Sequence, residues 1–138
     1  MAAKDIYHDI VKEALIKDKW NVNYDPYILE ADGTDYNVDL GAEKLVAATK
    51  GKRKILLEIK SFIQQSKTYE MHQALGQFQT YFLALQDQEP DRDLFLAVPK
   101  TEYETFFQKL FIQKLISYYK VKIVVFDPIT ITIEKWIE

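Results

Sequence analysis

The feature that most constrains the fold is an alternation of side chains at residues 55–60. The odd-numbered positions are all isoleucine or leucine, while the even-numbered ones are Leu56, Glu58 and Lys60. Successive side chains of a β-strand point to opposite faces, so the segment predicts a strand with one apolar face. Glu58 and Lys60 then share the other face at the end of the strand.

A second predicted strand ends near Asp39. Apolar residues at 36, 38 and 40 alternate with Asn37 and Asp39, and Gly41-Ala42 is the expected position of a bulge before residues 43–49. Residues 50–53 are the expected turn to the next strand. If the strand that ends near Asp39 pairs with the strand over residues 55–60, the carboxylates of Asp39 and Glu58 converge on one side of the sheet. Leu57 and Ile59 are then buried on the other side.

Periodicity and turn signals predict the other elements of the N-terminal two thirds. Amphipathic stripes predict helices over 4–19 and 69–86. Between the first helix and Asp39, the dipeptides Asp25-Pro26 and Asp32-Gly33 separate short runs rich in valine, tyrosine and isoleucine. These runs are predicted to be strands.

The C-terminal third alternates again between the two types of element. A strand over 93–98 stops at Pro99, and Thr101–Glu104 has the pattern of a capping box that opens a helix. Helical pieces continue to about Tyr119, followed by strands over 121–126 and 129–137, the last at the sheet edge. The order α-β-β-β-α-β-α-β-β predicts an α/β (α+β) protein with one mixed β-sheet flanked by helices.

The 138 residues fit a single domain, and 48% of them are hydrophobic, which is enough for a core. The aromatic-rich segment is expected to lie in that core, with a partner-binding surface as the alternative; it comprises Tyr103, Phe106, Phe107, Phe111, Tyr118 and Tyr119. No apolar run reaches the roughly 20 residues that span a bilayer, and the N-terminal residues become charged at once. We therefore expect a cytoplasmic protein without a membrane segment.

Charge limits how the chain could hold nucleic acid. The formal net charge is −3, so bulk attraction to DNA is excluded and any contact must be local. Lys52 and Arg53, in a basic cluster over 50–54, are candidate DNA contacts, although a solvated hairpin tip explains them equally well.

The sequence also limits the ligands that a metal could find. It has no cysteine, so a metal ion would be held by carboxylates, imidazoles, carbonyls or water, which favours Mg²⁺ or Mn²⁺. Two carboxylates such as Asp39 and Glu58 repel each other when clustered, and a divalent cation relieves that repulsion. An amine such as that of Lys60 would assist a water attacking a phosphodiester. The three side chains together predict metal-assisted phosphodiester hydrolysis.

These residues resemble the signature of the PD-(D/E)xK nuclease superfamily, in which an aspartate is followed after a hairpin by Glu-x-Lys. The expected core order αβββαβ is similar too, and Gln77 and Tyr81 resemble the QxxxY element of its RecB-like branch. The sequence departs from the signature at Val38, which stands in place of a proline that is not a ligand. The resemblance implies that Asp39, Glu58 and the Ile59 carbonyl bind the metal.

The resemblance also implies roles for the residues around the metal. Lys60 assists the attacking water, Gln77 orients the lysine or a phosphate, and Tyr81 contacts DNA. His8 is similar to a histidine that some of these nucleases place near the metal, although an ordinary helix histidine explains it as well. The roles of Glu13 and Glu43 stay undecided.

A closer resemblance extends over nearly the whole chain. Five segments are similar to the XisH family: Lys4-Asp5-Ile6-Tyr7-His8-Asp9, Asp39-Leu40-Gly41-Ala42-Glu43, Glu58-Ile59-Lys60-Ser61-Phe62, Ala74-Leu75-Gly76-Gln77-Phe78 and Gln88-Glu89-Pro90-Asp91-Arg92. That family is cyanobacterial and is named as a controlling factor for excision of the fdxN element, a DNA segment removed during heterocyst development. It is associated with a partner called XisI. The resemblance therefore implies DNA and an XisI-like protein as partners.

Three functional hypotheses remain open at this point. The first is a DNA-directed endonuclease-like protein with an Mg²⁺ or Mn²⁺ site, acting in programmed DNA rearrangement. The second is a regulatory adaptor that binds DNA or XisI without cleavage, and the third is an α/β protein without a nucleic-acid role. The oligomeric state, including a homo-oligomer, is also open.

Overall fold

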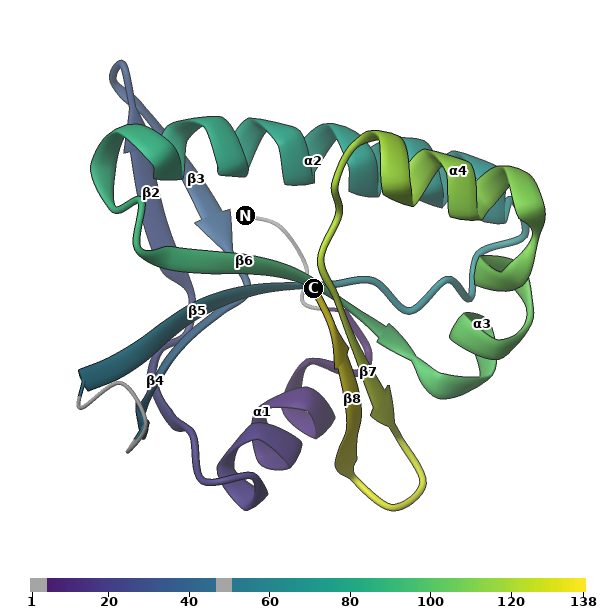
Figure 1. The fold of residues 1–138 in the computed structure, drawn as a ribbon, viewed down its shortest axis with the longest axis horizontal. Coiled ribbons are helices and arrows are strands. Elements are labelled where there is room, and N and C mark those ends of the chain that lie inside the picture. Colours follow the sequence, from purple (N-terminus) through teal and green to yellow (C-terminus); the bar gives the residue numbers. More distant parts are fainter. Residues whose placement is uncertain (1–4, 47–50) are drawn as a thin grey trace.

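The computed structural model describes residues 5–46 and 51–138, and Figure 1 shows their arrangement. The first half contains helix α1 (His8–Lys17) and strands β1 (Asn21–Tyr24), β2 (Tyr27–Ala31), β3 (Thr34–Val38), β4 (Leu40–Val46) and β5 (Gly51–Ile59). The second half contains α2 (Lys67–Gln88), β6 (Arg92–Pro99), α3 (Lys100–Glu104), the short 3-10 helix η1 (Phe106–Gln108), α4 (Leu110–Tyr118), β7 (Ile123–Asp127) and β8 (Thr132–Ile137). None of the helices so described is long and apolar enough to cross a membrane.

Six strands form one mixed sheet in the order β1-β4-β5-β6-β7-β8. The central strands β5, β6 and β7 run parallel, and the outer pairs are antiparallel. Strands β2 and β3 form a separate antiparallel hairpin, which lies beside α2. The predicted mixed sheet with flanking helices is therefore confirmed, and so is β8 as an edge strand.

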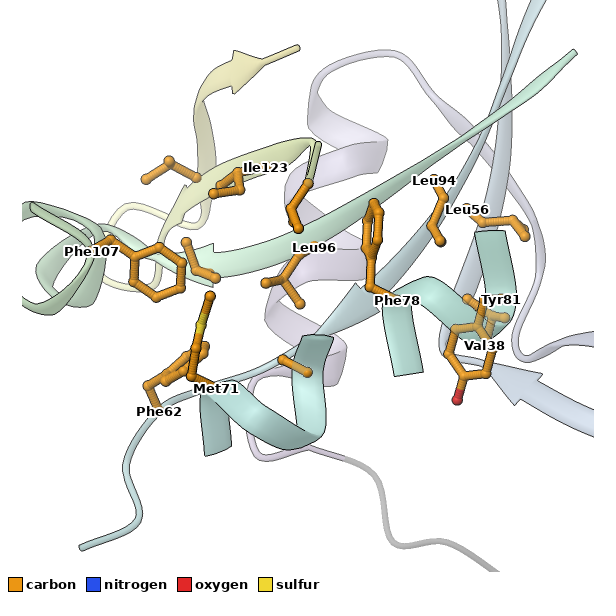
Figure 2. Packing of buried hydrophobic residues seen from close by; sticks show 14 of the residues in the cluster. Val38, Leu56, Phe62, Met71, Phe78, Tyr81, Leu94, Leu96, Phe107 and Ile123 are labelled. Atoms are coloured by element: carbon orange, nitrogen blue, oxygen red, sulfur yellow. The ribbon is translucent and has the colours of Figure 1, made fainter. Parts of the chain in front are cut away.

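The sheet has an apolar core on each face. Alternate side chains of β5 point into one core or the other. Ile55, Leu57 and Ile59 pack with Val11 and Leu15 of α1 on one face. Leu56 belongs to the larger cluster on the other face, beneath α2 (Figures 1 and 2), with Met71, Phe78, Leu94, Leu96, Phe107 and Ile123. Glu58 and Lys60 follow Leu56 at alternate positions, so they lie toward the α2 face.

The predicted element order is right for the main sheet, and the runs around Asp32-Gly33 form strands as predicted, although the order did not count them. Between α1 and α2 the chain forms five strands, of which β1, β4 and β5 join the sheet and supply the expected αβββ order. The other two are the inserted hairpin β2–β3, whose turn contains Asp32 and Gly33, both at positive φ. Asp25-Pro26 separates β1 from β2, as the turn signal predicted.

The expected bulge at Gly41-Ala42 is wrong. The chain breaks at Asp39, between β3 and β4, and Gly41 continues β4. The register irregularity lies on the partner strand β1, between Val22 and Tyr24. A Cβ at Gly41 would lie 3.1 Å from side-chain atoms of Tyr24 and Leu56, so the missing side chain leaves room for those two side chains over β4.

Several boundaries also differ from the predictions. Helix α1 is shorter than 4–19, and residues 1–4 lie outside the described residues. Lys52 and Arg53 belong to β5 rather than to a turn, because β5 pairs with β4 there, while residue 50 is outside the described part. The capping box is not formed: Pro99 is the N-cap of α3, without a side-chain cap bond, and Thr101 is inside the helix.

The aromatic segment divides between core and surface. Phe106 and Phe107 are buried, and Phe107 packs against Phe62. Phe111 and Tyr118 are instead 68% and 78% exposed. The prediction that the whole segment lies in the core is therefore wrong for α4, because periodicity marks apolar residues without showing which face is covered.

Candidate functional site

Asp39 lies where the chain passes from the β2–β3 hairpin into the main sheet. Leu40 pairs with Leu57, which sets Asp39 beside Glu58 on the neighbouring strand. The backbone N–H of Ile59 donates to Asp39 Oδ2 at 2.7 Å and fixes the carboxylate at the end of β5. Burial raises the pKa of Asp39, while this hydrogen bond, His8 and Lys60 act in the opposite direction.

Glu58 is a buried carboxylate without enough partners. Its residue is 5% exposed, and Oε1 makes no hydrogen bond to the described residues. Burial, and then the neighbouring charge of Asp39, raise the pKa of Glu58 from 4.5 to about 8. An unpaired oxygen at this depth is costly unless a ligand or a proton satisfies it.

Lys60 supplies the positive charge of the group. Its Nζ lies 3.7 Å from Glu58 Oε2, and its main-chain N–H donates to the Ala97 carbonyl at 3.0 Å, which ties the end of β5 to β6. The side chain is 20% exposed. The structure thus brings Asp39, Glu58 and Lys60 together at one end of β5, as the alternation predicted.

These three side chains open into a cleft of about 410 Å³. Its walls come from the start of the described chain, β3, the end of β5, the following loop and α2, and the lining residues are Asp5, Asp35, Tyr36, Asn37, Asp39, Glu58, Ile59, Lys60, Gln64, Gln77 and Tyr81. Gln77 and Tyr81 therefore lie in the same cleft as the carboxylates. The structure therefore brings the predicted residues of the strands and those of the helix into one cleft.

The α2 wall offers a further unpaired acceptor. Gln77 Oε1 is buried and makes no hydrogen bond to the described residues. Tyr81 is 6% exposed, its ring lies 6.2 Å from that of Tyr36, and Figure 2 shows it beside Val38 in the core. Burial, together with Glu58 and Asp39, raises the pKa of the Tyr81 hydroxyl. Tyr81 thus presents a neutral phenol to the acidic cleft.

The side chains of the cleft supply only some of the ligands that a hard divalent cation needs. Within residues 5–46 and 51–138, no group of three or more histidine, aspartate or glutamate side chains is arranged to hold a metal. Two carboxylates with raised pKa values and an unpaired Glu58 oxygen nevertheless suit a cation that keeps several waters, as Mg²⁺ does. The Ile59 carbonyl remains a predicted third ligand.

Two acidic residues of this region were missed by the sequence reasoning. Asp5 accepts a hydrogen bond from the Ser61 N–H at 3.0 Å and lines the cleft. Glu70, in the first turn of α2, is 5% exposed, its Oε2 has no hydrogen-bond partner within residues 5–46 and 51–138, and burial and Asp5 raise its pKa. Glu70 could have been noticed as a carboxylate next to Met71 in the apolar stripe of α2, whereas the pairing of Asp5 with Ser61 has no local signal.

The basic candidates lie far from the cleft. Lys52 is six residues before Glu58 on β5, which corresponds to roughly 20 Å along the strand. Its Nζ is 3.3 Å from Glu43 Oε2, and Arg53 pairs with Asp93 Oδ2 at 3.3 Å. Their predicted DNA contact is not part of the cleft, and it stays a prediction.

The undecided residues have mostly structural environments. Glu43 binds Lys52 and also Arg92, 3.4 Å away, and Glu13 is exposed on α1. His8 is 3% exposed, and its Nε2 lies 2.6 Å from Asp25 Oδ1, so α1 is tied to the turn between β1 and β2. His8 is still near enough to lower the pKa of Asp39.

Comparison with known proteins identifies the family. The family model described as XisH protein matches residues 1–134. A crystal structure of an XisH family protein from Nostoc punctiforme PCC 73102 is 39% identical, with a TM-score of 0.88, and the match covers 97% of this chain and 100% of that one. A crystal structure of an fdxN element excision controlling factor protein from Anabaena variabilis is 42% identical, also with a TM-score of 0.88. That match covers 98% of this chain and 100% of the other. No curated protein matches the chain. The chain belongs to the XisH family.

Proposed function

We propose that this protein acts on DNA in the control of element excision, through a metal-dependent phosphodiesterase site formed by Asp39, Glu58 and Lys60. The observation that carries the proposal is a pair of carboxylates in one cleft, half-buried Asp39 and buried Glu58, with a Glu58 oxygen that has no hydrogen-bond partner among the described residues. The solved relative named as an fdxN element excision controlling factor supports the link to excision. Heterocyst development and a cytoplasmic location belong to the same proposal.

Asp39 and Glu58 would hold Mg²⁺ or Mn²⁺, together with the Ile59 carbonyl. Bound there, the ion would supply Lewis-acid stabilisation of the charge that develops on a phosphodiester. The hydrogen bond from the Ile59 N–H keeps Asp39 oriented, and pairing of β4 with β5 keeps Glu58 beside it. Both carboxylates would be ionised in this state, because the charge of the ion would offset the burial that raises their pKa values.

Lys60 and Gln77 would act on the attacking water and the phosphate. The Lys60 ammonium lies beside Glu58 and in the cleft, where it can hold the water and offset negative charge. Gln77 has a buried carbonyl oxygen without a partner among the described residues, and it can accept a hydrogen bond from the Lys60 ammonium or from the water. Tyr81 can donate its phenolic hydrogen to a phosphate oxygen, because its raised pKa keeps it protonated.

One observation favours a second candidate function, a non-catalytic adaptor that binds DNA or an XisI-like protein. Among the residues that the structure describes, the cleft is lined by four acidic side chains, Asp5, Asp35, Asp39 and Glu58, and by one cation, Lys60. Such a surface repels a phosphate backbone. A nuclease with this cleft needs metal ions or a basic partner to approach DNA, whereas an adaptor that binds an XisI-like protein needs neither.

Calorimetric titration with Mn²⁺ tests the metal site. Wild type should bind weakly but measurably, since these ions rely on substrate phosphates for further ligands. Asp39→Ala and Glu58→Gln should lose the heat of binding. Asp35→Asn is the matched control, because Asp35 lines the same cleft but lies on β3 and is exposed. Binding by Asp39→Ala equal to that of wild type would place the ion elsewhere and remove the basis of the proposal.

A further inference from the structure

One face of helix α4 packs against the core, and the opposite face exposes large apolar side chains among polar ones. Ile112 is buried in the core beneath α2, and Leu115 and Ile116 pack against it. On the outer face Leu110, Phe111 and Tyr118 are 84%, 68% and 78% exposed. Large apolar side chains that are exposed together in this way mark interaction sites.

The residues of the exposed face lie next to one another along the helix. Positions 111, 114 and 118 repeat at helical spacing, so they lie along one side of α4. Shallow grooves run there, lined by Leu110, Phe111, Gln113, Lys114, Leu115, Ser117 and Tyr118. None of these residues lines the cleft around Glu58, so a partner on α4 leaves that cleft open.

The charged residues around α4 indicate which kind of partner covers this face. Residues 105–126 contain no aspartate or glutamate, although the chain has 21 of them, and they include four lysines. Lys109, Lys114 and Lys120 are exposed and make no ion pair with the residues that the structure describes. Lys114 lies between Phe111 and Tyr118 on the outer face, and Lys109 and Lys120 flank the helix at its two ends. An apolar face with these cations complements an apolar surface edged with carboxylates, and such complementarity selects the partner.

We infer that the outer face of α4 binds a protein partner that presents an apolar ridge bordered by acidic side chains. A second copy of this chain, docked face to face, would bring the same lysines together. Single-stranded nucleic acid stacks on aromatic rings, whereas Leu110, the most exposed residue of the face, is aliphatic. The face therefore fits an acidic amphipathic helix better than either.

The test uses a designed acidic amphipathic peptide of about 18 residues, long enough to form a helix, with leucines on one face and glutamates beside them. Its twin has lysine in place of every glutamate. We expect the acidic peptide to bind the full-length protein and to shift backbone amide NMR signals of α4, with the twin at least about tenfold weaker. Phe111→Ser and Lys114→Glu should each weaken binding about tenfold or more, since central aromatic residues dominate interfaces.

Ile129→Ser is the matched control, because Ile129 is 90% exposed but lies outside residues 105–126. It should bind like wild type, and thermal melts should show that all variants remain folded. Equal binding of both peptides, or no effect of Phe111→Ser and Lys114→Glu, would overturn the inference. So would a wild-type dimer in sedimentation that Phe111→Ser disperses, or binding of oligothymidine at α4 in preference to the acidic peptide.

Discussion

Replacing Glu58 by glutamine should remove a pH dependence of stability that the wild-type protein carries. Burial and Asp39 raise the pKa of Glu58 from 4.5 to about 8 in the folded state. A carboxyl group with a raised folded pKa contributes its full stability below the unfolded pKa and loses it as pH rises through the folded pKa. For Glu58 the loss therefore falls between pH 4.5 and about 8.

The magnitude follows from the same shift. At about 1.36 kcal/mol for each pKa unit, a rise from 4.5 to about 8 corresponds to about 5 kcal/mol. Relaxation and water entry reduce the cost of a buried charge, so we expect wild type to lose about 2–4 kcal/mol relative to Glu58→Gln across this range. Glutamine resembles the protonated acid, so the two proteins should have similar stability at the acidic end.

Urea unfolding in the presence of a chelator, at about pH 5 and about pH 9, measures the difference. The free energies of unfolding should diverge at high pH, with Glu58→Gln the more stable. Asp35→Asn should follow the wild-type curve, because Asp35 is exposed in the same cleft. A constant difference between wild type and Glu58→Gln at both pH values would refute the assignment of Glu58 as a buried acid of raised pKa.

Three further predictions concern the site and its support. Mn²⁺ at about 100 times its Kd should raise the free energy of unfolding of wild type by about 2.7 kcal/mol near neutral pH, with no effect on Asp39→Ala; an equal rise in the variant would contradict the metal site. Asp25→Asn should destabilise the fold by about 1–3 kcal/mol in urea unfolding, because Asp25 accepts from His8 at 2.6 Å and from Lys12 at 2.8 Å, and an unchanged midpoint would show that the pairs are unimportant. Arg92→Met should cost about 2–4 kcal/mol by the same assay, since Arg92 is 4% exposed, bonds Glu89 at 2.8 Å and lies over the Tyr27 ring; a cost under about 1 kcal/mol would mean that its carboxylate partners find water instead.

The centre of the candidate site was predictable from the sequence because its pattern is local. Alternation along one strand places Glu58 and Lys60 on a common face, and one hairpin brings Asp39 to them. The break at Asp39 was not predictable in this way, since it separates β3, which pairs only with β2, from β4, which pairs with β1 and β5. A local pattern carries no information about a contact made by a distant strand.

Long-range contacts explain the other omissions. Asp5 reaches Ser61 across 56 positions of sequence, and no pattern around either residue indicates it. The separation of Lys52 and Arg53 from the cleft follows from the length of β5, which the expected turn at 50–53 concealed. The outer face of α4 was misassigned because Phe111 and Tyr118 have the spacing of core residues without being covered.

The most direct test of the central claim is cleavage of DNA by the purified protein in Mn²⁺. Wild type, Glu58→Gln and Lys60→Ala would be compared on duplex, single-stranded and branched DNA, with and without an XisI-like protein. We expect wild type to cleave at least one substrate in a metal-dependent manner, and both variants to lose most of that activity, because the metal ligand and the cation act together. Equal cleavage by all three proteins would indicate a contaminating nuclease. DNA binding by wild type without cleavage of any substrate would contradict the phosphodiesterase assignment and favour the adaptor.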